Sequence, residues 1–137
     1  MRPFEYTAPR SLEEAAELLG TFGADGCVLA GGTDLLVEFR RPKARQYKAV
    51  VDISRVRELG GIAETDGAVV VRPLTTHAAL CASPVLHQYA PLLSLAASLI
   101  GSPQLRNRGT VGGNIMNAAT CADTVPPLIA LGATVGF

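Results

Sequence analysis

Residues 27–39, Cys-Val-Leu-Ala-Gly-Gly-Thr-Asp-Leu-Leu-Val-Glu-Phe, decide the fold that this sequence predicts. Cys27–Ala30 is a short apolar run typical of a buried strand, and Thr33 or Asp34 can cap a helix through Phe39. Ala49–Ile53 indicates the next strand. A strand, a glycine turn, a helix and a second strand make a compact βαβ unit, in which loop amides and the helix start converge where an anion can bind.

The glycine turn of this unit, Ala30-Gly31-Gly32-Thr33-Asp34, is one half of a candidate diphosphate site. Glycines tolerate positive φ and let backbone N–H groups approach an anion closely. Because the Asp34 carboxylate would repel a phosphate, we expect it to turn back and cap the helix. Taken alone, a glycine pair after a strand is also compatible with an ordinary tight turn.

The second half is Gly109-Thr110-Val111-Gly112-Gly113-Asn114. Thr110 and Asn114 can hydrogen-bond phosphate oxygens, and we expect Gly112 and Gly113 to expose backbone donors. Two such loops favour a dinucleotide cofactor, although neither matches the standard Rossmann or P-loop spacing. Three charged residues nearby bear on this site: Arg106 and Arg108, which can offset diphosphate charge, and Asp123, which can cap a helix or accept from a ribose hydroxyl.

The rest of the chain alternates helix signals with one hairpin signal. Ser11–Glu14 is a capping box for a helix that Gly20 would close, and Asp66-Gly67 joins two β-prone runs, 62–65 and 68–71, which predicts a mixed sheet. Residues 92–100 are apolar nearly all round, as in a helix packed on several sides. Further helices are predicted after Thr75 or Thr76, after Ser83, and over 125–131, with a strand starting at Ala133.

Composition excludes several functions. The 137 residues carry 12 Lys+Arg and 12 Asp+Glu, so no global charge attracts nucleic acid, and 48% hydrophobic residues suffice for a core. No stretch is long and apolar enough to span a bilayer, and the start lacks a secretory signal, so we expect a cytoplasmic protein with no integral membrane segment. The end of the chain inside an apparent strand favours a fragment of a longer product.

Cysteine, histidine and basic residues suggest no catalytic or metal site of their own. Cys27, Cys81 and Cys121 lack metal-ligand spacing and indicate buried structural thiols. His77 and His87 lie far apart in sequence, and we interpret them as packed or surface residues. A basic run follows Phe39 and suits either a solvated loop or a docking surface for a partner or an anion: Arg40, Arg41, Lys43, Arg45 and Lys48.

The amino-acid sequences of four segments, and their order along the chain, resemble those of one family. These are 29–36 (LAGGTDLL), 51–53 (VDI), 74–80 (LTTHAAL) and 104–115 (QLRNRGTVGGNI). They resemble the FAD-binding medium subunit of molybdenum hydroxylases, the family of aerobic carbon monoxide dehydrogenase and xanthine dehydrogenase. The resemblance implies an α+β FAD-binding fold of the vanillyl-alcohol oxidase type with two small lobes: an N-terminal α/β lobe, 1–54, and a second α+β lobe, 55–137, whose C-terminal part is missing.

The resemblance also implies roles for individual residues. Asn117 and Asp123 would reach toward the phosphate and ribose region, while Ile100 and Gly101 would lie near the isoalloxazine ring. The segment 117–123 departs from the family's usual serine-proline wording, which affects the contacts of Thr120 and Cys121. The residues that the resemblance assigns to the diphosphate are Ala30, Gly31, Gly32, Thr33, Asp34, Thr110, Val111, Gly112, Gly113 and Asn114.

Three functions follow from these observations. The first is an FAD-binding electron-transfer subunit, which passes electrons from a partner's [2Fe–2S] clusters through flavin to an external acceptor, with the molybdenum site on a large partner subunit. In that case the flavin carries the chemistry and this chain supplies no catalytic residue and no metal ligand. The alternatives are an assembly or interaction module without flavin, and a self-sufficient flavin oxidase.

Overall fold

A computed structural model describes residues 3–136 of the chain. These residues form two compact units, one up to Leu59 and the other from Gly60 onward. The sequence places the lobe boundary after residue 54, whereas this division falls five residues later, behind two short 3-10 turns, Ile53–Arg55 and Arg57–Leu59. Each unit is described by itself below.

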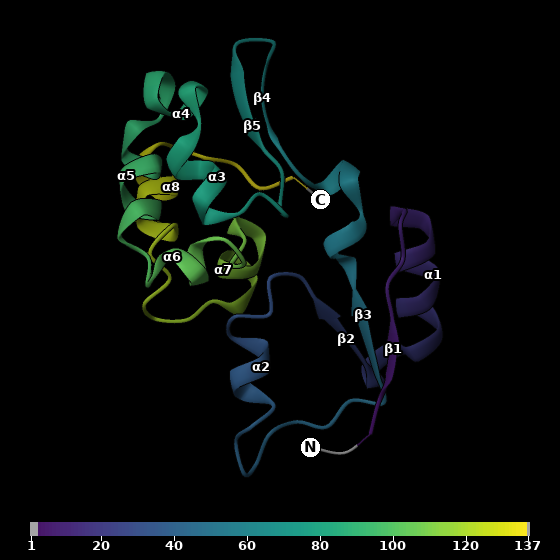
Figure 1. The fold of residues 1–137 in the computed structure, drawn as a ribbon. Helices are drawn as coiled ribbons and strands as arrows, with labels where there is room; N and C mark the ends of the chain where they lie inside the picture. Colours follow the sequence, from purple (N-terminus) through teal and green to yellow (C-terminus); the bar gives the residue numbers. More distant parts are fainter. Residues whose placement is uncertain (1–2, 137) are drawn as a thin grey trace. The chain divides into compact units, whose positions relative to one another are not determined.

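The first unit is built on a parallel sheet of three short strands in the order β1-β3-β2 (Figure 1). The strands are β1 (Glu5–Thr7), β2 (Gly26–Leu29) and β3 (Ala49–Asp52), and β3 is buried along its whole length. Parallel pairing of β2 with β3, with α2 (Leu35–Glu38) between them in sequence, confirms the predicted βαβ unit. The glycine turn therefore leaves the carboxyl end of β2, the edge at which ligands of open parallel sheets bind.

Helix α1 (Leu12–Phe22) packs against β2 and β3. The Ser11 hydroxyl accepts from the Glu14 N–H at 3.1 Å, and Glu14 Oε2 accepts from the Arg10 N–H at 2.9 Å, so the predicted capping residues are confirmed. The helix runs through Gly20, which we had expected to close it, and ends where Gly23 takes a φ of +51°. A glycine that keeps a negative, helical φ only lowers helix propensity, so Gly20 does not end α1.

The second unit combines a hairpin with short helices. Strands β4 (Ile62–Thr65) and β5 (Ala68–Val71) pair antiparallel around Asp66 and Gly67, both at positive φ, as an Asp-Gly turn requires. Helix α5 packs against its neighbours α3, α4 and α8, and the core contains Leu80, Leu86, Leu93, Ala97 and Val111. The helices are α3 (His77–Ala82), α4 (Pro84–Tyr89), α5 (Pro91–Leu99), α6 (Pro103–Arg106), α7 (Val111–Asn117) and α8 (Val125–Ala130).

Two predictions about elements are wrong, and one strand was missed. Within residues 3–136 the hairpin forms its own two-stranded sheet, so the predicted mixed sheet is wrong. Strand β1 was not predicted, because three residues carry too little periodicity. Helix α5 packs against α3, α4 and α8, so the prediction that it is packed on several sides is confirmed, although Leu95 and Leu99 remain exposed. Residues 133–136 form no strand, and Phe137 lies outside the described residues.

Candidate functional site

The turn after β2 presents a row of backbone donors. Among residues 3–136, no carbonyl or side chain accepts a hydrogen bond from the N–H groups of Gly31, Gly32, Thr33 or Asp34. Gly32 has a φ of +75°, and a Cβ built there would lie 2.9 Å from Leu29 Cδ1. Positive φ in such a turn directs successive amides toward a common side, which suits an anion. This turn therefore has the donors that a pyrophosphate needs.

Asp34 does not cap the following helix, which corrects our expectation. It lies at the N-cap position of α2, yet its side chain makes no capping hydrogen bond and is exposed. The physical reason is its backbone, since φ −95° and ψ −46° are already helical, whereas a capping side chain needs the extended region. The carboxylate therefore projects into solvent.

The second glycine motif is not an open loop but the first turn of α7. The Thr110 hydroxyl caps this helix by accepting from the Gly113 N–H at 3.1 Å. The Val111 N–H donates to Thr75 O at 2.9 Å, the Gly112 N–H to Pro73 O at 2.9 Å, and the Asn114 N–H to Thr110 O at 2.9 Å. The expectation that Gly112 and Gly113 expose free backbone donors is therefore wrong, because the protein's own acceptors engage both.

Gly112 is needed for packing. A Cβ at Gly112 would lie 2.6 Å from Pro73 Cβ and 2.8 Å from Pro73 O, and one at Gly113 would lie 2.9 Å from Thr110 Oγ1. Neither glycine has a positive φ. The Val111 side chain is buried in the hydrophobic core. The motif GTVGGN thus fixes the start of α7 tightly against the segment 73–76.

The side chain of Asn114, in the middle of α7, is held by two hydrogen bonds. Its Oδ1 accepts from the Thr124 hydroxyl at 2.5 Å and from the Thr124 N–H at 3.3 Å. Thr124 is completely buried, with 0% of its surface exposed. No described residue accepts a hydrogen bond from the Asn114 Nδ2 group, so this group remains available as a donor.

Ile100 and Gly101 form a turn between α5 and α6. Gly101 has a φ of +43°, and the Arg106 guanidinium donates to Ile100 O at 3.0 Å and to Gly101 O at 3.4 Å. Arg106 is thereby committed to this turn, while Arg108 is exposed. Asn117 and Asp123 are exposed, and α8 begins after Thr124 without a side-chain cap, so the capping role considered for Asp123 is wrong.

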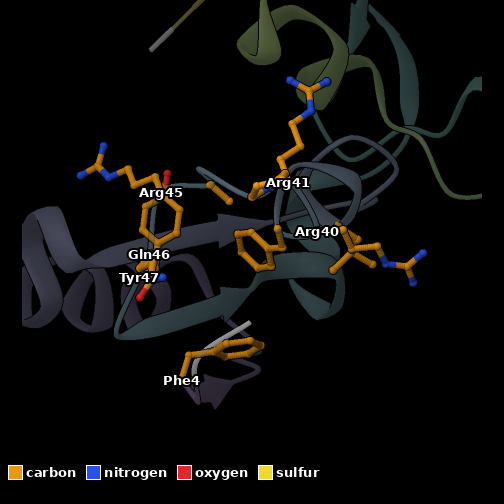
Figure 2. Close-up of a pocket in the computed structure, with 10 residues that line it drawn as sticks. Phe4, Arg40, Arg41, Arg45, Gln46 and Tyr47 are labelled. Atoms are coloured by element: carbon orange, nitrogen blue, oxygen red, sulfur yellow. The ribbon is translucent and has the colours of Figure 1, made fainter.

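Three residues of the basic run, Arg40, Arg41 and Arg45, line a shallow cavity of about 550 Å³ in the first unit together with Phe4, Leu36, Phe39 and Tyr47 (Figure 2). Three of the five basic residues are engaged within the unit: Arg41 pairs with Glu38 at 2.8 Å, Lys48 pairs with Asp25 at 2.6 Å, and the Arg45 guanidinium donates to Ala24 O at 2.7 Å. Figure 2 shows the guanidinium groups of Arg40 and Arg41 pointing in different directions. They do not converge on one point, so the cavity has no anion clamp.

The three thiols differ in environment. Cys27 is buried in β2, Cys81 is half-buried and Cys121 is exposed, so the expectation of buried thiols is wrong for Cys121. Burial raises the pKa of the Cys27 thiol, against smaller opposing effects of Tyr47 and Arg45. His77 is buried, and its ring lies against Gly109. The backbone N–H of His77 donates to Gly109 O at 3.0 Å.

Two further observations concern residues 3–136. None of their helices combines the length and the apolar character needed to cross a bilayer. No group of three or more His, Cys, Asp and Glu side chains gathers there as a possible metal site.

Comparison with known proteins identifies the family. The profile of the FAD binding domain in molybdopterin dehydrogenases matches residues 2–137. The carbon monoxide dehydrogenase medium chain of Hydrogenophaga pseudoflava is 46% identical over 112 residues, 82% of this chain and 39% of that protein. The 6-hydroxypseudooxynicotine dehydrogenase complex subunit alpha of Paenarthrobacter nicotinovorans is 40% identical over 139 residues, 98% of this chain and 46% of that protein.

A solved structure agrees with these matches. Reconstituted CO dehydrogenase from Oligotropha carboxidovorans superposes with a TM-score of 0.81 at 35% identity, over 85% of this chain and 40% of that one. The fold is therefore that of an α+β FAD-binding domain. The chain belongs to the family of FAD-binding domains of molybdopterin dehydrogenases, whose cofactor is FAD. It spans less than half the length of the curated relatives it matches.

The described residues fit this cofactor. A pyrophosphate requires hydrogen-bond donors, and each unit by itself holds some: the unbonded amides of Gly31–Asp34 in the first unit, and the Asn114 Nδ2 group in the second. Sequence reasoning found both motifs but missed Thr124, whose buried hydroxyl has no recognisable sequence signal.

Proposed function

We propose that this chain is the FAD-binding part of an electron-transfer subunit in a molybdenum hydroxylase complex. In such a complex, electrons would come from [2Fe–2S] clusters on a small partner subunit and leave the flavin to an external acceptor. FAD supplies the redox chemistry when bound. The amide row of Gly31–Asp34 is the observation that carries the proposal, because these donors lack acceptors among the described residues.

The partner subunits rest on the relatives. The names of two relatives, a medium chain and a complex subunit, describe proteins that work in assemblies. A large subunit with the molybdenum cofactor and a small subunit with the iron–sulfur clusters would complete the complex. A cytoplasmic location and an oxidoreductase activity that needs these partners belong to the same proposal.

The role of this chain is to bind and orient the cofactor. The Gly31–Asp34 amides would hold pyrophosphate oxygens, with Ala30 leading into the turn, and Asn114 would add a side-chain donor. Thr110, Val111, Gly112 and Gly113 would act by fixing the start of α7, on which Asn114 lies. The residues proposed to lie near the ring, phosphate or ribose are Ile100, Gly101, Asn117 and Asp123.

Gly32→Ala tests the amide row against a matched control. Gly32 and Gly23 both lie at positive φ in the first unit, so alanine strains the backbone at either site, but only Gly32 belongs to the row. We expect Gly32→Ala to weaken FAD binding at least tenfold, measured by quenching of flavin fluorescence, and Gly23→Ala to leave it unchanged. Wild-type affinity in Gly32→Ala would refute the role of the turn.

The same titration separates the alternatives. A wild-type chain that takes up no FAD would favour an interaction module without flavin. A flavin-loaded chain that oxidises a substrate without partner subunits would favour a self-sufficient oxidase. In the assembled complex, anaerobic addition of substrate should bleach the visible flavin band; a band that persists while the clusters are reduced would contradict electron transfer to the flavin.

A further inference from the structure

The contact between Asn114 and Thr124 fixes which way the Asn114 amide points. The Thr124 backbone N–H can only donate, so the atom that accepts from it at 3.3 Å must be the amide oxygen. The Thr124 hydroxyl donates to the same oxygen at 2.5 Å. Two donors on one oxygen remove the ambiguity between oxygen and nitrogen that an asparagine side chain otherwise has. The NH₂ group of Asn114 must therefore lie on the other side.

The position of Thr124 makes this contact costly to break. Thr124 is completely buried at the start of α8, and Asn114 is half-buried in the middle of α7. A buried hydroxyl that loses its acceptor keeps the cost of its desolvation, so the pair is favoured over any other rotamer of Asn114. The link also joins α7 to the N-cap residue of α8, and the two linked residues are ten apart in sequence. One threonine thus holds a side chain on a different helix.

We propose that Thr124 is a positioning residue for FAD: it holds the Asn114 oxygen so that Nδ2 donates to a pyrophosphate oxygen. This proposal rests on the proposed function, because it takes FAD as the ligand. Without the two Thr124 donors the amide could rotate and present its oxygen, which would repel a phosphate. Thr124 itself would not touch the cofactor.

Three variants of the full chain test the proposal by titration with FAD. Thr124→Val removes the hydroxyl at nearly constant volume, and we expect FAD to bind about two- to tenfold more weakly. Thr124→Ser restores the hydroxyl and should restore the affinity. Asn114→Asp keeps the acceptor for Thr124 but replaces the NH₂ donor with an anionic oxygen, and we expect a loss on the order of a hundredfold.

A control and a spectroscopic measurement separate positioning from general stability. Ser94 is a buried hydroxyl in the same unit that donates to Cys81 O at 3.3 Å, so Ser94→Ala should alter the melting temperature of the apo protein without altering FAD affinity. By NMR, the Asn114 side-chain NH₂ resonances should shift when FAD is added to wild type and to Thr124→Ser. In Thr124→Val the two proton signals should differ from those of wild type before any FAD is added, because Oδ1 keeps the backbone N–H of residue 124 but loses the hydroxyl donor.

The outcomes distinguish the two proposals. If wild type binds FAD and Thr124→Val, folded, binds it equally well, the positioning role is overturned and the proposed function stands. If wild type binds no FAD, both are overturned. If Thr124→Val does not fold, Asn114→Asp decides, since it retains the contact with Thr124, and unchanged affinity there would overturn the inference.

Discussion

At the residue scale, the carboxylate of Asp52 at the end of β3 is held on two sides. The Tyr6 hydroxyl donates to Oδ2 at 2.5 Å, and the Ser54 N–H donates to Oδ1 at 2.9 Å. Asp52 is buried, so losing a donor leaves a poorly solvated charge. We expect Tyr6→Phe to lower the free energy of unfolding by about 1.5–3 kcal/mol, measured by urea denaturation. Tyr89→Phe, an exposed ring on α4, is the control and should change little; equal losses in both would contradict this role of Tyr6.

The Cys27 thiol gives a second residue-scale prediction, which concerns pH. Its folded pKa is raised by burial, so the folded chain retains this proton after the unfolded chain has lost it. The contribution of Cys27 to stability is therefore complete below about pH 8.5, the ordinary pKa of a thiol, and declines as pH rises above that. Urea unfolding between pH 7 and pH 10 should show a smaller decline in Cys27→Ala. Identical slopes in the two proteins would contradict it.

At the element scale, the same substitution should have opposite effects in two helices. Gly20 lies inside α1 with nothing within 4 Å of a built Cβ, so Gly20→Ala should stabilise the protein by about 0.5–1 kcal/mol through helix propensity. Gly112 lies inside α7 against Pro73, so Gly112→Ala should destabilise it by about 1–3 kcal/mol. Thermal unfolding of the two apo variants measures both signs. A stabilising Gly112→Ala would show that Pro73 can move aside.

Sequence reasoning succeeded for elements whose signals are local. Ser11 caps α1, Ser83 caps α4 by accepting from the Leu86 N–H, and Asp66-Gly67 turns the hairpin, because each interaction spans only a few residues. It failed at Gly112, where the partner is Pro73, about forty residues away, which no local pattern contains. The prediction that Asp34 caps α2 failed for a different reason. The residue type shows that an aspartate can cap a helix, but it does not show which φ and ψ this aspartate adopts.

At the scale of the whole molecule, the two glycine motifs should respond differently to FAD. The amides of Gly31–Asp34 have no acceptor among the described residues, whereas those of Val111–Asn114 are already bonded within the protein. Hydrogen exchange should therefore be fast in the first motif of the apo protein and slow strongly with FAD, and change little in the second. Protection that appears only in the second motif would reverse the roles proposed for them.

The family and the cofactor were predicted from the sequence motifs. The different roles of the two glycine motifs became clear only from the structure. The resemblance correctly gave an FAD-binding domain of molybdopterin dehydrogenases. The resemblance treated both glycine pairs alike, because the amino-acid sequence does not show whether a backbone N–H already donates a hydrogen bond within the protein. Gly32 differs from Gly112 only through φ and neighbours, which are properties of the folded chain.

The positive φ at Gly32 has a consequence for binding energetics. The chain sets the directions of these amides when it folds, before any ligand arrives. A ligand that binds to a preorganised turn immobilises little backbone. Binding therefore costs less conformational entropy than binding to a flexible turn would. Tight retention of a cofactor then requires few contacts beyond those already aimed at it.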